Sequence, residues 1–363
     1  MRTSLSVQKG SAERLPQSAA MSAPGLLLVP FLGCAVSWGL TYLVFRYALQ
    51  RGLLDQPNSR SSHSVATPRG GGLAIVATYI AIVLAFFAVG RVQTGLAAAL
   101  VGAGSFVAFL GYIDDRRSLA PRWRFLGHLA GTAWVLAWLG SLPAVPIFGT
   151  LLDLGMAAYL LAALYLVWSI NLFNFMDGID GIASLEAIAV SLGGAFVWWL
   201  TQPQGDWPLA VAFAACVAGF LVWNFPPARI FMGDAGSGFL GCVVATLALW
   251  SSHTAPHLFW SWFILGGCFM VDATVTLVRR VARGERFSEA HRSHAYQYAA
   301  RRHGSHKCVS VAYMLVTLLW LLPIAIVVAM GRIDGLVGVL VAYVPLVGLA
   351  WHYKAGDRAG QES

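Results

Sequence analysis

Two carboxamides and two carboxylates stand close together near the middle of the chain. Asn171, Asn174, Asp177 and Asp180 follow one another at intervals of three residues, where one long apolar run ends and the next begins. A charged side chain at the edge of a bilayer is costly unless it faces water or a partner, so such residues are candidates for function. If the segment is helical, Asp177 and Asp180 lie on one face, with Asn174 a turn earlier. A polar loop without a chemical role is the alternative interpretation.

Three further aspartates stand at comparable places. Asp114 and Asp115 are adjacent at the end of an apolar run, and Asp234 lies among glycines just before another run. Adjacent residues of a helix do not share a face, so the pair is expected to divide its roles, unless the arginines that follow simply neutralise both. Magnesium is usually held by one or two carboxylates together with substrate phosphates, and phosphoryl transfer depends mostly on positioning and charge stabilisation. The aspartates therefore indicate metal-assisted phosphoryl transfer.

The elements that must position these residues are membrane helices. The chain has 363 residues, of which 58% are hydrophobic and 11% charged, and its mean hydropathy is +0.68. This is more apolar surface than a soluble core can bury. Since about 20 apolar residues are enough for a helix to cross a bilayer, we predict an all-α, polytopic integral membrane protein with about 11 transmembrane helices. The predicted segments are 25–49, 72–90, 95–113, 123–142, 154–170, 182–201, 208–223, 238–251, 257–278, 309–330 and 335–352.

The distribution of arginine and lysine indicates the orientation. The connections between the predicted segments fall alternately on the two sides of the membrane. Those on one side, together with the C-terminal tail, hold 18 of these residues, and those on the other side hold only Arg91 and Arg332. The side richer in arginine and lysine is normally cytoplasmic. The aspartates follow the third, fifth and seventh segments, so all of them fall on this side. We therefore predict an active-site cleft on the cytoplasmic face.

A single domain accounts for nearly the whole chain. We predict a polar N-terminal tail at 1–24, one transmembrane catalytic domain at 25–353 and a cytoplasmic C-terminal tail at 354–363. The longest and most basic of the predicted cytoplasmic loops is the last one, 279–308. The predicted cytoplasmic loops are 50–71, 114–122, 171–181, 224–237 and 279–308.

The basic loop 279–308 is the expected counterpart of the aspartates. It contains His291, Arg292 and His294 among further arginines. Arginine forks and histidine donors suit phosphate, so the loop is expected to contact a phosphorylated substrate. Simple contact with anionic lipid is the alternative interpretation. A diphosphate substrate held at the membrane edge would use both the acidic and the basic residues.

A cation- or proton-coupled transporter is the alternative from another functional class. Such a protein places its binding residues near the bilayer midplane, whereas the aspartates named above stand at the ends of the predicted segments. Asp272 lies inside a segment, and we interpret it as a buried partner of Arg279 or Arg280. The sequence therefore favours an enzyme with one membrane-borne reactant.

Five motifs occur in a consistent order between about residues 50 and 310. They are Pro57-Asn58-x-Arg60-Ser61-Ser62-His63, Asp114-Asp115, Asn171-x-x-Asn174-x-x-Asp177-Gly178-x-Asp180-Gly181, Asn224-Phe225-Pro226-Pro227-Ala228-x-Ile230-Phe231-Met232-Gly233-Asp234-x-Gly236-Ser237 and His291-Arg292-Ser293-His294. Together they resemble the polyprenyl-phosphate N-acetylhexosamine-1-phosphate transferases of glycosyltransferase family 4, which are related to the phospho-MurNAc-pentapeptide translocase and the UDP-GlcNAc:undecaprenyl-phosphate GlcNAc-1-phosphate transferase. The first and last motifs are similar to those of the branch that initiates O-antigen synthesis.

The resemblance implies a reaction and its partners. A sugar 1-phosphate would pass from a UDP-N-acetylhexosamine to undecaprenyl phosphate in the lipid bilayer, with release of UMP and with Mg²⁺ or Mn²⁺ as cofactor. The product would initiate O-antigen or another cell-surface polysaccharide at the bacterial inner membrane, and no nucleic-acid partner is expected. The donor sugar and the oligomeric state stay open. So does the choice between a covalent intermediate and direct attack, which we favour because the lipid phosphate is already an anionic nucleophile.

Carried over position by position, the resemblance also implies roles for single residues. Asp234 would bind the metal, Asp115 would support the metal or a phosphate, and Asp114 would be the general base toward the lipid phosphate. Asp177 and Asp180 would line the catalytic cleft. The residues expected to bind substrate are Arg60, His63, Asn171, Asn174, Asn224, His291, Arg292 and His294.

One departure from the translocase pattern bears on the substrate. The translocase branch has a lysine shortly after its paired aspartates and three consecutive histidines in the late loop. Here Ser118 stands in the first place, and His291 and His294 are separated in the second. This difference disfavours a muramoyl-pentapeptide donor and favours a plain N-acetylated hexosamine.

Overall fold

The computed structural model of the protein describes residues 23–56, 65–285 and 291–357. The described residues form an all-α fold, as predicted, and every predicted apolar segment corresponds to a helix or to consecutive helices. The helices are α1 (Ala23–Arg51), α2 (Gly72–Ala88), α3 (Thr94–Ala98), α4 (Gly104–Arg117), α5 (Pro121–Leu139), α6 (Met156–Met176), α7 (Ile182–Thr201), α8 (Trp207–Asn224), α9 (Asp234–Ser252), α10 (His257–Leu265), α11 (Gly267–Ala282), α12 (Ala295–His303), α13 (His306–Val316), α14 (Leu322–Ala329) and α15 (Gly335–His352), with π-helical segments η1 (Ala99–Ala103) and η2 (Thr317–Leu321).

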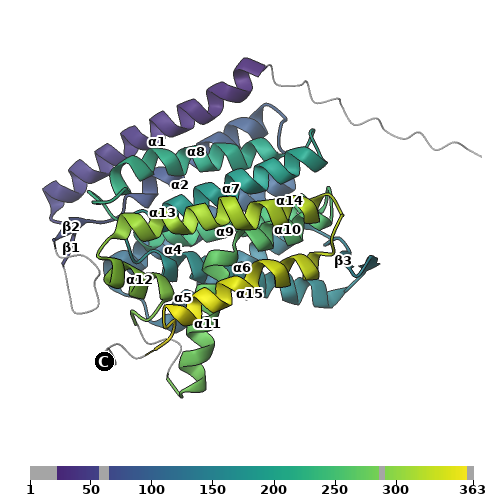
Figure 1. Ribbon diagram of the computed structural model, residues 1–363. Helices are drawn as coiled ribbons and strands as arrows, with labels where there is room; N and C mark the ends of the chain where they lie inside the picture. Colours follow the sequence, from purple (N-terminus) through teal and green to yellow (C-terminus); the bar gives the residue numbers. More distant parts are fainter. Residues whose placement is uncertain (1–22, 57–64, 286–290, 358–363) are drawn as a thin grey trace, which may run out of the picture.

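Short strands close two of the connections between helices. Among the described residues, β1 (Leu54–Asp55) pairs antiparallel with β2 (Thr67–Pro68), and β3 (Val145–Ile147) pairs antiparallel with β4 (Thr150–Leu152). The first pair lies at the end of the bundle where α12 is found, and the second lies at the opposite end (Figure 1). The strands therefore close connections and add no layer to the fold.

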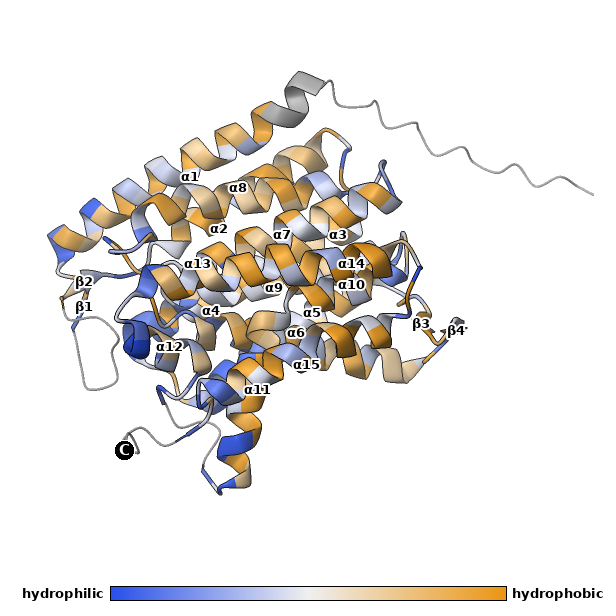
Figure 2. Cartoon of the chain, in the orientation of Figure 1, coloured by the Kyte–Doolittle hydropathy of each residue, from blue (hydrophilic) through white to orange (hydrophobic). Residues whose placement is uncertain are grey.

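Eight helical stretches of the described chain are long and apolar enough to cross a membrane, or nine if the bent pair α10 and α11 forms one span. Helix α2, with 17 residues, is shorter than these. The protein is therefore a multi-pass membrane protein, while the larger predicted number of spans stays a prediction. Figure 2 shows the hydrophilic residues gathered on α12 and on the far end of α11, away from the apolar bodies of the long helices.

Helix α9 forms the centre of the bundle (Figure 1), and its apolar window is completely buried. Small residues allow this, because helices in a membrane associate through close packing of their backbones. A Cβ at Gly241 would lie 2.1 Å from the carbonyl oxygen of Ser169 on α6, and one at Gly236 would lie 2.7 Å from the Cα of Gly72 on α2. Helix α9 is thereby packed closely against α6 and α2, and the contact with α2 lies two residues after Asp234.

The predicted segment 257–278 is broken in the structure. Its two parts, α10 and α11, meet at Gly266 with an angle of 69°, and α11 leaves the bundle (Figure 1). Glycines at a helix joint permit such a kink. Asp272 lies on the departing helix α11, and the prediction that it pairs with Arg279 or Arg280 is wrong.

Candidate active site

Arg69 joins two of the predicted aspartates. Its Nη2 atom lies 2.9 Å from Oδ1 of Asp115 and 2.8 Å from Oδ1 of Asp234. The chain fixes this arrangement locally, because the N–H groups of residues 70 and 71 donate to the carbonyl oxygen of Phe231 and the N–H of Phe231 donates to the carbonyl oxygen of Pro68. The segment that precedes α2 is thus paired with the segment that precedes α9.

Asp115 stabilises the beginning of α9. Its two carboxylate oxygens accept the backbone N–H groups of Asp234 at 3.0 Å and Ala235 at 3.3 Å. The first N–H groups of a helix have no partner inside the helix, and a carboxylate is favoured there by the helix dipole. Asp115 therefore positions both Asp234 and Arg69, and its predicted contact with a metal stays a prediction.

Asp114 points to a different set of partners, as expected for adjacent residues of a helix. Its carboxylate accepts the N–H of Leu119 at 2.6 Å and a hydrogen bond from Arg124 at 2.8 Å. The side chain is buried. Each of the two oxygens accepts one hydrogen bond and keeps a second lone pair, so the contacts leave room for a proton and the predicted role of Asp114 as general base stays a prediction.

The central segment does not continue as a helix. Helix α6 ends at Met176, so Asp177 and Asp180 lie in the turn before α7 and not on a shared helical face. Asp180 accepts the N–H of Ala228 at 3.1 Å, which ties this turn to the connection between α8 and α9. The turn, and not a helix, therefore presents both carboxylates.

The asparagines hold the same turns. Asn224 is buried, accepts the N–H of Gly181 at 3.1 Å and donates to the carbonyl oxygen of Ile230 at 3.0 Å. Asn174 donates to the hydroxyl of Ser237 at 3.1 Å. These contacts support the predicted placement of Asn174 and Asn224 in the site.

Asn171 lies one turn further back along α6. Its amide donates to the carbonyl oxygen of Val167 at 2.7 Å, within the same helix. It is not one of the residues that line the cavity described next. Of the three asparagines predicted to bind substrate, it is therefore the one that the fold keeps away from the cavity.

A polar cavity of about 190 Å³ lies where these turns meet. Besides three of the predicted aspartates, its wall contains one cationic side chain, three amides and a histidine. Of these five groups, the sequence analysis selected only the two asparagines. The polar residues lining it include Asp55, Arg69, Asn174, Asp177, Asp180, Asn224, Asp234, Ser237, Gln297 and His306.

A larger cavity of about 740 Å³ adjoins the polar one. The two share Asp55 and Arg69, and Asp115 lies on the larger one. Apolar side chains such as Leu43 of α1 and Leu73 of α2 form most of its remaining wall, which also contains Tyr112 and Arg116. A polar site thus opens beside a groove that suits an apolar chain.

Burial, together with neighbouring negative charges, raises the pKa of the Asp177 carboxyl in the cavity. Burial raises the pKa of Asp177 well above its usual range, and the charges of Asp234 and Asp115 add to this rise, whereas the guanidinium of Arg69 opposes it. Like charges this close cannot all ionise easily without a cation. The aspartates of the site therefore outnumber the positive charge that Arg69 supplies.

The donor atoms suit magnesium only in part. Within the described residues, no group of three His, Cys, Asp or Glu side chains is placed to hold a metal ion. Magnesium needs fewer protein ligands than three, because it commonly binds one or two carboxylates and fills its other coordination positions with water and phosphate oxygens. Asp234 and Asp177, which both line the cavity, fit that smaller requirement.

Two residues of the late basic loop 279–308, Gln297 and His306, line the polar cavity, whereas the substrate contacts expected of His291, Arg292 and His294 stay predictions. His294 is buried, and neither it, His291 nor Arg292 lines the polar cavity. His294 Nδ1 lies 3.3 Å from Oδ1 of Asp272. Arg60 and His63 fall outside the described residues.

Asp272 is buried as predicted, but the predicted partners are wrong. Its carboxylate accepts the N–H groups of Ala295 at 2.9 Å and Tyr296 at 3.0 Å, and the hydroxyl of Tyr313 at 2.8 Å. Arg279 instead pairs with Asp357, and Arg280 with Glu285. Asp272 and the two arginines lie on the same helix but about two turns apart, which separates their side chains along the helix axis. Asp272 faces α12 instead and stabilises its beginning.

His306, like Arg69, is a site residue that the sequence analysis missed. It begins α13, lines the polar cavity, and its Nδ1 lies 3.5 Å from Oδ1 of Asp180. The available signal was a histidine after Ser305, a good helix N-cap, at the start of an apolar run on the basic side. The sequence analysis selected His291 and His294 instead, which lie fifteen and twelve residues earlier in a more prominent motif.

Similarity to known proteins identifies the family of the chain. The model of glycosyl transferase family 4 matches residues 97–252. A probable undecaprenyl-phosphate N-acetylglucosaminyl 1-phosphate transferase of Bacillus subtilis is 34% identical over 290 residues, which cover 76% of this chain and 78% of the relative. A decaprenyl-phosphate N-acetylglucosaminephosphotransferase of Mycobacterium tuberculosis is 30% identical over 350 residues, covering 82% of this chain and 84% of the relative.

A third relative comes from another group of enzymes. The phospho-N-acetylmuramoyl-pentapeptide-transferase of Moorella thermoacetica is 40% identical over 160 residues, covering 43% of this chain and 48% of the relative. The two longer alignments extend far beyond the region of the family model. With its clustered aspartates at the ends of membrane helices and these relatives along most of its length, the chain belongs to glycosyl transferase family 4.

Proposed function

We propose that the protein transfers a sugar 1-phosphate from a UDP-N-acetylhexosamine to undecaprenyl phosphate and releases UMP. The observation that carries the proposal is the polar cavity with Asp177, Asp234 and Arg69, placed directly beside a larger cavity with a largely apolar wall. A nucleotide sugar needs the first environment and a polyprenyl chain needs the second. The names of the relatives from Bacillus subtilis and Mycobacterium tuberculosis support the same reaction.

The proposed reaction is a direct displacement. An oxygen of the lipid phosphate forms a bond to the phosphorus that carries the sugar, the bond from this phosphorus to the bridging oxygen breaks, and UMP leaves with that oxygen. Asp234 and Asp177 would hold Mg²⁺, which supplies positive charge to the diphosphate when bound. Arg69 would contact a phosphate oxygen at the junction of the two cavities, and Asp115 would keep Arg69 and the start of α9 in position.

The biological setting is part of the proposal. The excess of arginine and lysine on the side of the aspartates supports an active site that faces the cytoplasm of a bacterial inner membrane, where UDP-sugars are made. The first and last sequence motifs support initiation of O-antigen or another surface polysaccharide. The missing lysine after the paired aspartates supports a plain N-acetylated hexosamine as the donor.

The test is UMP release by purified protein in detergent. The assay contains undecaprenyl phosphate, Mg²⁺ and a panel of UDP-N-acetylhexosamines, each with and without EDTA. Release that needs the lipid, occurs with one donor and stops with EDTA supports the proposal and names the sugar. If folded protein releases UMP from no donor, while proteoliposomes show a coupled cation flux, the transporter takes its place.

His306 is expected to bind the donor. Replacement by alanine should raise the KM for the UDP-sugar by about tenfold or more, because a hydrogen bond to a charged group contributes roughly 1.5–3 kcal/mol. The KM for the lipid should change little. Steady-state kinetics with each substrate varied in turn measure both values.

His291→Ala is the comparison for this variant. His291 lies outside the polar cavity, so its replacement should change the donor KM less than His306→Ala does. The reverse order would return donor binding to the basic loop at 291–294, as the resemblance implied.

A further inference from the structure

An apolar cavity lies on the side of α12 and α13 away from the active site. It has a volume of about 300 Å³ and is enclosed by α11, α12, α13 and α15. Its wall consists mostly of small and aliphatic side chains, among them Ala299, Val309, Ala312, Leu346 and Ala350. The exposed Leu349 on α15 belongs to the same wall, so the cavity borders a surface that faces lipid.

A basic pocket of about 320 Å³ lies next to it, at the end of α15. Arg301 and Arg302 come from α12, and Lys354 comes from the turn that follows α15. Aromatic rings hold the arginines in place, since the guanidinium of Arg301 lies 4.4 Å from the ring centre of Tyr298 and that of Arg302 lies 6.0 Å from the ring centre of Tyr353. Guanidinium groups arranged in this way bind phosphate well.

The apolar cavity and the basic pocket form one amphiphilic site. Tyr353 lines both of them. His303, which lines the apolar part, lies with its Nε2 atom 3.1 Å from the hydroxyl oxygen of Tyr353. A molecule with a phosphate group and an apolar chain can therefore place the phosphate on the arginines and the chain among α12, α13 and α15.

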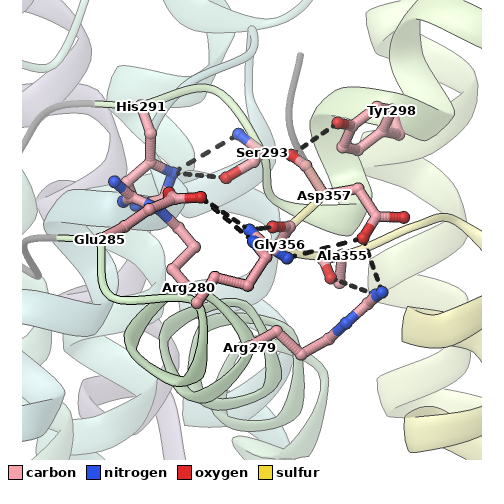
Figure 3. Close-up of polar contacts among 10 residues, drawn as sticks. Arg279, Arg280, Glu285, His291, Ser293, Tyr298, Ala355, Gly356 and Asp357 are labelled. Carbon is pink, nitrogen blue, oxygen red and sulfur yellow. Dashed lines mark hydrogen bonds and ion pairs between the residues drawn. The ribbon is translucent and has the colours of Figure 1, made fainter. Parts of the chain in front are cut away.

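The turn that carries Lys354 is firmly held, as Figure 3 shows. Arg279 of α11 donates to the carbonyl oxygen of Ala355 at 2.5 Å and to Asp357 at 2.6 Å. The N–H of Gly356 donates to the carbonyl oxygen of Ser293 at 2.6 Å, and the hydroxyl of Tyr298 donates to the carbonyl oxygen of Asp357 at 2.9 Å. Since Asp357 is engaged with Arg279, the three cations of the pocket are not neutralised by this carboxylate.

Helix α12 connects this site with the active site. Its residue Gln297 lines the polar cavity, while Arg301 and Arg302, about one turn further on, line the basic pocket. Tyr296 donates to the carbonyl oxygen of Phe175, two residues before Asp177. A ligand that fixes the far end of α12 thus also fixes the residues that α12 contributes to the active site.

We propose that this site binds an anionic phospholipid of the surrounding bilayer, and that the bound lipid holds α12 in its active position. The three cations match a phosphate headgroup, and the adjoining apolar cavity matches an acyl chain. The polyprenyl acceptor is not the occupant, because the site shares no lining residue with the polar cavity in the described part of the chain. The effect on activity rests on the proposed transferase function, whereas lipid binding does not.

The experiment measures binding and activity separately. Protein in nanodiscs of phosphatidylcholine receives increasing amounts of phosphatidylglycerol, and native mass spectrometry counts the retained phosphatidylglycerol. The charge variant combines R301Q, R302Q and K354Q. The matched control combines R46Q, R51Q and R122Q, which remove three exposed cations from the same end of the bundle. The cavity variant Ala312→Phe fills the apolar part and keeps every charge.

The proposal is supported if the wild type and the control retain phosphatidylglycerol and the charge variant binds it with an affinity lower on the order of 100-fold. This size is expected because each cation contributes about fivefold to the affinity near an anionic surface. Reduced retention in Ala312→Phe supports the acyl-chain part. Equal retention in the charge variant and the control overturns the proposal. So does displacement of the lipid by undecaprenyl phosphate, which would assign the site to the acceptor.

UMP release in the same nanodiscs is expected to rise with phosphatidylglycerol in the wild type and not in the charge variant. If lipid is retained but does not raise UMP release, the regulatory part is overturned. If no donor supports UMP release at all, the transferase function fails while the lipid site is still decided by mass spectrometry.

Discussion

Asp234→Asn should reduce lipid-dependent UMP release by about 10²- to 10³-fold, as expected when one group of a preorganised electrostatic site is lost. Asp234 lies at the start of the central helix α9, lines the polar cavity and pairs with Arg69 at 2.8 Å. Asparagine keeps the size of the side chain but removes the charge that would hold a metal and that balances Arg69. The loss is therefore expected in kcat, measured at saturating donor and lipid, and added Mg²⁺ should not restore it.

Asp334→Asn provides the matched control. Asp334 also stands at the beginning of a helix, where it caps α15 by accepting the N–H groups of Leu336 and Val337. Asparagine caps helices about as well as aspartate, so activity should stay within about twofold of the wild type. If Asp234→Asn kept more than a tenth of the wild-type kcat, the assignment of Asp234 to the metal would be wrong.

Gly111→Ala should cause the second large effect, although residue 111 contacts no substrate. A Cβ at this position would lie 2.4 Å from the carbonyl oxygen of Asp234 and 2.5 Å from the N atom of Ala235. Helix α4 must then move away from the start of α9, which separates the paired aspartates from Asp234. A displacement of about 1 Å in a site of this kind costs about 100-fold in rate, and overpacking lowers the free energy of unfolding by roughly 1–3 kcal/mol.

The measurements for this variant are UMP release and thermal unfolding in detergent. Gly39→Ala is the control, because a Cβ at that position of α1 meets no atom within 4 Å. It should keep full activity and unfold at or slightly above the wild-type temperature, since alanine favours a helix over glycine. Wild-type activity in Gly111→Ala would contradict the tight contact between α4 and α9 at the site.

The sequence alone determined which parts of the chain are apolar and on which side of them the charges fall. Each apolar segment is long enough to satisfy its own backbone hydrogen bonds as a helix, so the helices could be predicted one at a time. Because the aspartates follow alternate segments, their meeting at one end of the bundle could be predicted without knowing how the helices pack. The structure places Asp177, Asp180 and Asp234 around one cavity accordingly.

The tertiary structure decided which polar residues face that cavity. The kink at Gly266 turns α11 outward, directs Asp272 to the backbone of α12 and keeps His291 and His294 away from the cavity. His306 enters the cavity instead, because the beginning of α13 lies beside the turn that contains Asp180. Such contacts depend on helix crossing angles and on side chains far apart in the sequence, whereas hydropathy and spacing describe each segment only by itself.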